Sequence, residues 1–81
     1  MRRMRVLLQQ PPVASEPVRF VQLSLEQDLL GGWTLVRESG QRGGRSQLRR
    51  DQYLERGEAV AAFEKARDQH LKRGFQPIAG D

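Results

Sequence analysis

The spacing of apolar residues changes once along this chain, and that change restricts the fold more than any other feature. In segment 19–25, Val21, Leu23 and Leu25 alternate with other residues, which is the two-residue period of a half-buried strand. From residue 58 onward, apolar residues recur at intervals of three and four, which indicates an amphipathic helix over Glu58–Arg73. The sequence therefore predicts strands first and one helix last.

Two further segments between these regions are typical of strands. Trp33–Glu38 is rich in β-branched and aromatic residues, and a third strand is predicted at roughly Gln47–Leu54. Segment 39–46 joins them and contains three glycines in eight residues, which favours a tight connection. We therefore predict an α+β fold in which one helix packs on one face of a small antiparallel sheet of three to four strands. The other face of the sheet is predicted to stay open.

The predicted helix carries signals at both ends. Glu58 lies in its first turn, and Lys72 and Arg73 lie in its last, which complements the helix dipole. Gly74 is predicted to end it, and segment 75–78 to form a short terminal extension. Trp33 is predicted to be a core anchor rather than a stacking platform for a base. The predicted core consists of Val21, Leu23, Trp33, Leu35, Val60 and Phe63.

The chain is long enough for only one folded domain. We expect residues 1–17 to form a flexible N-terminal tail and residues 18–81 to form that domain. Three prolines between residues 11 and 17 disfavour a helix or a central strand. Segment 5–9 is compatible with an edge strand or with disorder, and disorder is the prediction.

The residue types present exclude several functions. The sequence has no cysteine, which removes disulfides, thiolate metal sites and a cysteine nucleophile. His70 is the one histidine, and on the apolar helix stripe it is expected to be packed rather than catalytic or metal-binding. We therefore predict no enzyme activity, no cofactor and no metal. No run of 18 apolar residues predicts a membrane span, and the short apolar stretch after the basic start does not predict a signal peptide, so a cytoplasmic location is expected.

The whole net charge of +4 arises from one segment. Between Arg37 and Arg50 there are five arginines and one acidic residue, whereas the rest of the chain has nine basic and nine acidic residues. Arginine forks recognise phosphate, and a glycine-rich turn exposes backbone N–H groups to anions. A solvated charged face around an ordinary hairpin turn is the alternative interpretation. The predicted nucleic-acid site consists of Arg37, Arg42, Arg45, Arg49, Arg50, Gly40 and Gly43.

Four stretches of the sequence, 19–23, 31–43, 58–65 and 72–75, resemble a bacterial WGR domain. The resemblance covers about residues 18–76. It implies a small antiparallel sheet with one helix, which agrees with the prediction from the residue pattern. It also implies a non-catalytic nucleic-acid-sensing module related to that of the DNA-dependent poly(ADP-ribose) polymerases.

The sequence departs from the family at its signature, because Ser39-Gly40-Gln41 stands where the family carries Trp-Gly-Arg. In the polymerases the tryptophan stacks on a sugar at a DNA end and the arginine helps to connect domains. Ser39 cannot stack and Gln41 carries no charge, so the resemblance implies phosphate contacts without end-specific stacking. The predicted partner is nucleic acid, with DNA in first place. The alternative is a protein-interaction module that uses the open sheet face or the loop and does not bind nucleic acid.

Overall fold

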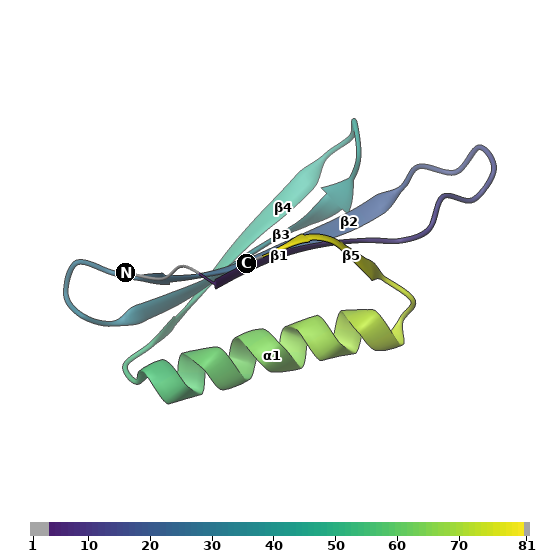
Figure 1. The fold of residues 1–81 in the computed structure, drawn as a ribbon. Helices are drawn as coiled ribbons and strands as arrows, with labels where there is room; N and C mark the ends of the chain where they lie inside the picture. The colour runs from purple at the N-terminus through teal and green to yellow at the C-terminus, as the bar shows by residue number, and fades with distance from the viewer. Residues whose placement is uncertain (1–3, 81) are drawn as a thin grey trace.

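Within residues 4–80, which are the residues the computed structural model describes, five antiparallel strands form one sheet and one long helix crosses one of its faces (Figure 1). The spatial order of the strands is β4-β3-β2-β1-β5. The predicted α+β class is confirmed, with five strands in place of three to four. In chain order the elements are β1 (Met4–Gln9), β2 (Arg19–Gln27), β3 (Trp33–Gln41), β4 (Ser46–Tyr53), α1 (Arg56–Lys72) and β5 (Gln76–Gly80).

The two additional strands come from segments expected to flank the sheet. Residues 4–9, predicted to belong to a flexible tail, form β1, which pairs with β2 on one side and β5 on the other. Val6 and Leu8 of β1 are buried in the core. The tail prediction is therefore corrected for residues 4–9, and residues 1–3 lie outside the described part of the chain. The three prolines lie in the exposed connection after β1, where they remove no hydrogen bond from the sheet.

The register of the sheet decides which side chains face the helix. Residues directly opposite one another on antiparallel strands point to the same face. Leu23 is opposite Val6 of β1 and Arg37 of β3, and Leu25 is opposite Leu35. All the apolar members of this set are buried, so this face is the one that α1 covers. The alternate residues of each strand point to the uncovered face, as predicted.

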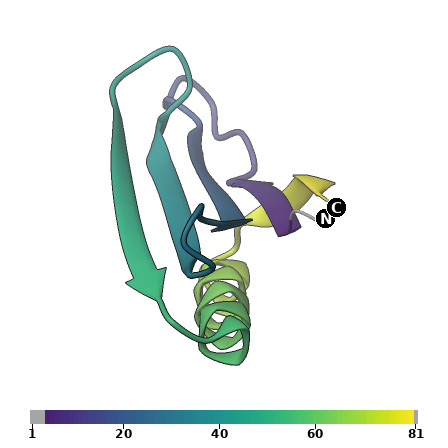
Figure 2. The same ribbon diagram turned by 90° about the vertical axis from the view of Figure 1, so that its left-hand side faces the viewer.

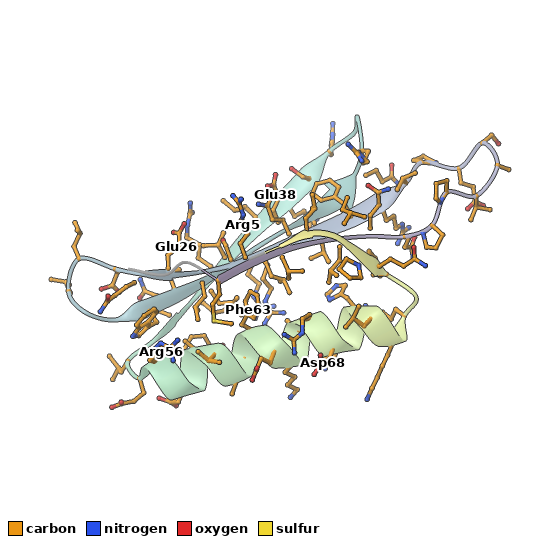
Figure 3. The ribbon with its side chains drawn as sticks, in the orientation of Figure 1. Arg5, Glu26, Glu38, Arg56, Phe63 and Asp68 are labelled. Atoms are coloured by element: carbon orange, nitrogen blue, oxygen red, sulfur yellow. The ribbon has the colours of Figure 1, made fainter. Side chains whose placement is uncertain are left out.

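Helix α1 packs through a narrow apolar stripe. Its buried residues are Ala59, Phe63 and Ala66, and the two alanines let the helix approach the sheet closely. Figure 3 shows Phe63 pointing from the helix towards the sheet, and its side chain is 3% exposed. Of the predicted core, Val21, Leu23, Leu35 and Phe63 are buried, whereas Trp33 and Val60 are half-buried and pack against them.

The end of α1 is capped by its own backbone. Gly74 has φ +92°, the left-handed conformation that ends a helix, so the sequence prediction at this glycine is confirmed. The N–H groups of Phe75 and Gly74 donate to the carbonyls of His70 and Leu71, both at 3.1 Å. The rings of His70 and Phe75 then meet edge to face with centroids 5.1 Å apart. This cap fixes both rings at one end of the sheet.

No helix among the described residues is long and apolar enough to cross a membrane.

Candidate nucleic-acid interface

Two of the predicted arginines lie beside each other on the helix-facing side of the sheet. Arg37 of β3 is directly opposite Arg49 of β4. Both contact the carboxylate of Asp51, with Nε of Arg37 at 3.6 Å and Nε of Arg49 at 3.3 Å from its oxygens. Among the described residues, neither Nε of Arg37 nor Oδ2 of Asp51 has a hydrogen-bond partner, so that contact is purely ionic. Asp51 thus offsets part of the positive charge that the sequence assigns to this pair.

Arg42 and Arg50 lie elsewhere. Arg50 is opposite Val36 in the register, so its side chain belongs to the uncovered face of the sheet. Arg42 lies in the β3–β4 turn, where its guanidinium donates to the side-chain oxygen of Gln9 at 2.7 Å. Its backbone N–H donates to the carbonyl of Val18, which ties the turn to the β1–β2 connection. The five arginines therefore do not form one continuous patch, because the sheet separates them.

Arg45 lies in a groove. The sequence predicts Arg45 as a site residue, but it does not predict the groove. The groove runs between the C-terminal end of α1 and the adjoining end of the sheet, has a volume of 570 Å³, and is lined by Arg45 together with Arg19 and Arg73. These three arginines come from the β3–β4 turn, from β2 and from the helix cap. No acidic side chain is among the described residues that line the groove. The described lining is therefore positively charged, which favours an anion in the groove.

The floor of the groove is the part of β3 that carries Ser39, Gly40 and Gln41. Ser39 lies between Val21 of β2 and Gln47 of β4, and Gln41 lies opposite Arg19. Since these pairs share a face, the Ser39 and Gln41 side chains face the groove rather than the uncovered side. The side chain of Ser39 is exposed, so none of the described residues covers it.

The two glycines of the predicted site have structural roles. A Cβ on Gly40 would collide with the backbone carbonyl of Arg45 and approach Cα of Ser46 to 2.7 Å, so β4 can approach β3 here only because residue 40 is glycine. Gly43 has φ +76°, which the β3–β4 turn requires. The glycines therefore shape the turn that carries Arg42 and Arg45.

His70 lines the groove as a packed residue. Its Nδ1 lies 2.8 Å from the carbonyl of Ala66, so Nδ1 carries a proton and donates to that oxygen. The other ring nitrogen, Nε2, is then left to act as an acceptor in the neutral ring or as a second donor in the charged one. The described residues include no group of three or more His, Cys, Asp or Glu side chains that could hold a metal.

The sequence reasoning missed Arg19, Arg73 and the groove itself. The sequence could have predicted the position of Arg19, because Arg19 is two residues from buried Val21 on the same strand and therefore points to the same face. The sequence held no such signal for Arg73, because its place beside β2 and β3 depends on where α1 ends against the sheet.

Trp33 lies at the opposite end of the sheet, half-buried, with the guanidinium of Arg56 5.7 Å from its ring centroid. It is therefore not part of this groove.

An antiparallel sheet of five strands with one helix across a single face defines a small α+β domain. The family model of the WGR domain matches residues 4–81, nearly the whole chain, and the chain therefore belongs to the WGR domain family. WGR domains are small non-catalytic modules known for nucleic-acid binding. A search of the curated proteins gave no match, and neither did a search of the solved structures.

Proposed function

We propose that this domain binds nucleic acid through the sugar-phosphate backbone, with DNA as the first ligand to test. The observation that supports the proposal is the groove that Arg19, Arg45 and Arg73 all line, with no acidic side chain among its described lining residues. Membership of the WGR family supports the ligand class. The proposal places the phosphate chain along the groove, beside the β3–β4 turn that carries Arg45.

Each phosphate contact contributes mainly by releasing counterions from the nucleic acid. Arginine suits this role, because its planar fork donates two parallel hydrogen bonds to one phosphate and stays charged at every physiological pH. Contacts of this kind carry little base information, so the domain is expected to bind many sequences with similar affinity.

The floor of the groove favours backbone binding over recognition of ends. Ser39 and Gln41 offer hydrogen bonds but no aromatic surface. Of the two phenylalanines at the groove, Phe20 is opposite Gly40 and has the phase of the uncovered face, and the ring of Phe75 already packs edge to face with that of His70. Base and sugar stacking therefore contributes little at this site, in contrast to what a tryptophan at position 39 would provide.

Fluorescence anisotropy with labelled oligonucleotides tests this proposal. A blunt duplex, a nicked duplex and a single strand are titrated with the chain at four salt concentrations. The proposal expects binding at low salt, with log K falling linearly against log salt at about 0.9 per phosphate contact on duplex DNA. Lys65→Ala is the matched control, because Lys65 is an exposed helix cation that does not line the groove. Absence of binding at low salt would contradict the proposal.

A further inference from the structure

The three most exposed large apolar side chains gather at the end of the molecule away from the groove. Among the described residues, Leu29 is 104% exposed, Leu30 98% and Leu54 89%. Leu29 and Leu30 lie in the β2–β3 turn, and Leu54 follows β4 at the start of α1, the end of the fold that Figure 2 shows from the front. Leu30 and Leu54 line one pocket of 430 Å³. Single exposed leucines are ordinary, but three at one site indicate a contact surface.

The turn that carries two of these leucines is held by its own hydrogen bonds. Oδ1 of Asp28 accepts from the N–H groups of Leu30 and Gly32, both at 2.9 Å. The backbone of Asp28 also donates to the carbonyl of Gly32 at 2.8 Å and accepts from Gly31 at 3.2 Å. The backbone of the leucines is therefore fixed before anything binds, which lowers the entropy lost on association.

The two segments that carry the leucines have a net charge opposite in sign to that of the groove lining. Segments 26–32 and 54–58, which contain the leucines, hold four acidic residues and one basic residue, Arg56. The guanidinium of Arg56 lies over the ring of Trp33. An apolar cluster with acidic neighbours is complementary to an apolar surface flanked by lysine or arginine.

We propose that Leu29, Leu30 and Leu54, which we call the leucine surface, form a docking site for a protein whose apolar face is flanked by basic side chains. The proposal goes beyond nucleic-acid binding and does not depend on it. Figure 1 shows the β2–β3 turn, which carries two of the leucines, and the C-terminal end of α1, which borders the groove, at opposite ends of the fold. The molecule measures 45 × 23 × 18 Å, so both sites can be occupied together. An anionic lipid surface is disfavoured, because the acidic neighbours repel it. A two-fold pair of this chain is disfavoured too, since such pairing places acidic segments against each other.

Titration of the isotope-labelled chain with two synthetic helical peptides tests the leucine surface. Both peptides carry the same leucine face, one flanked by lysines and the other by glutamates. The amide shifts are expected to change in segments 28–32 and 52–56 with the lysine peptide, and the glutamate peptide to bind at least about tenfold more weakly. Equal binding of both peptides, or shifts outside these segments, overturns the proposal.

Two variants distinguish specific binding at the leucine surface from non-specific hydrophobic binding. Leu29→Ser combined with Leu30→Ser should abolish the shifts without unfolding the chain, because both side chains lie outside the core. Leu48→Ser is the matched control, since Leu48 is a 53% exposed leucine of β4 elsewhere on the sheet, and binding should be unchanged. Binding of the parent to phosphatidylglycerol vesicles, or self-association on sedimentation that the double substitution removes, would each replace the proposed partner and overturn the proposal.

Discussion

Arg37 on β3 lies directly opposite Arg49 on β4, and both guanidinium groups contact the one carboxylate of Asp51. Like charges at directly opposite positions of a sheet destabilise it by a fraction of a kcal/mol to about 1 kcal/mol. Asp51 lies two residues further along β4 on the same face, so its negative charge offsets this repulsion. The side chains of Arg37 and Asp51 are 29% and 25% exposed, which limits screening by solvent.

We therefore expect Asp51→Asn to destabilise the domain by about 1 kcal/mol at low salt, equivalent to roughly 4–8 °C in Tm for a domain of this size. High salt should reduce the loss, because it screens the two arginines from each other. Thermal unfolding at two salt concentrations measures both effects. Asp68→Asn is the control, since Asp68 is an exposed helix residue paired only with its neighbour Arg67 in the described contacts. Equal losses for the two variants would show that Asp51 has no special role.

Phe63→Ala tests the packing of the helix on the sheet. Phe63 is the one large side chain among the three buried helix residues, and its loss leaves a cavity against β2 and β3. The expected cost is about 3–5 kcal/mol, close to the whole stability of a small domain. Denaturant unfolding provides the measurement, with Leu71→Ala as the control, because Leu71 on the same helix is 40% exposed and should cost much less. A parent-like midpoint for Phe63→Ala would contradict this account of the core.

A pair of glycine substitutions tests the close approach of β3 and β4. At Gly40 a Cβ meets backbone atoms of Arg45 and Ser46, so Gly40→Ala should cost about 1–3 kcal/mol. At Gly57, in the first turn of α1, a Cβ meets nothing within 4 Å, and Gly57→Ala should stabilise the domain by up to about 1 kcal/mol. Opposite shifts in Tm are therefore expected. A fall in Tm for both variants would mean that the close contact at Gly40 does not determine the effect of the substitution.

The fold class followed from the sequence because its signals are local. Alternation around Val21 and the helical spacing around Phe63 each specify an element and its buried face, and Gly74 specifies where the helix ends. The sequence did not predict β1, because its pairing with β2 and β5 is long-range. Its six residues, ahead of a proline-rich stretch, are too few for their apolar alternation to identify a strand.

The candidate site was less predictable than the fold. Segment charge identified the β3–β4 region correctly as basic, but charge summed along the chain does not say on which face of a strand each arginine lies. Arg49 and Arg50 are neighbours in sequence and therefore point to opposite faces of the sheet. The groove also needs Arg73, which reaches the site only through the packing of α1.

Arg45 and Arg50 distinguish the groove from a diffuse basic surface. Arg45 lines the groove, whereas Arg50 belongs to the uncovered face. We expect Arg45→Ala to weaken DNA binding and to flatten the salt slope by about 0.9, the value for one lost phosphate contact, and Arg50→Ala to leave both unchanged. Anisotropy titrations at the same four salt concentrations provide the measurement. Equal effects of the two substitutions would point to binding by the whole basic segment and not by the groove.

Ser39→Trp tests whether the groove retains the geometry for binding a nucleic-acid end. Ser39 faces the groove between Val21 and Gln47 and its side chain is exposed, so an indole at this position has space above β3. If the indole stacks as aromatic side chains do on bases, affinity for a blunt or nicked end should rise by about 1–3 kcal/mol at fixed salt. A duplex closed at both ends by hairpin loops should bind as before, because it presents no end. Ser46→Trp is the matched control, since Ser46 lies opposite Gly40 and points to the other face of the same hairpin. A rise of equal size with the closed duplex, or with Ser46→Trp, would mean that the indole adds only general affinity and that the floor of the groove is not where an end binds.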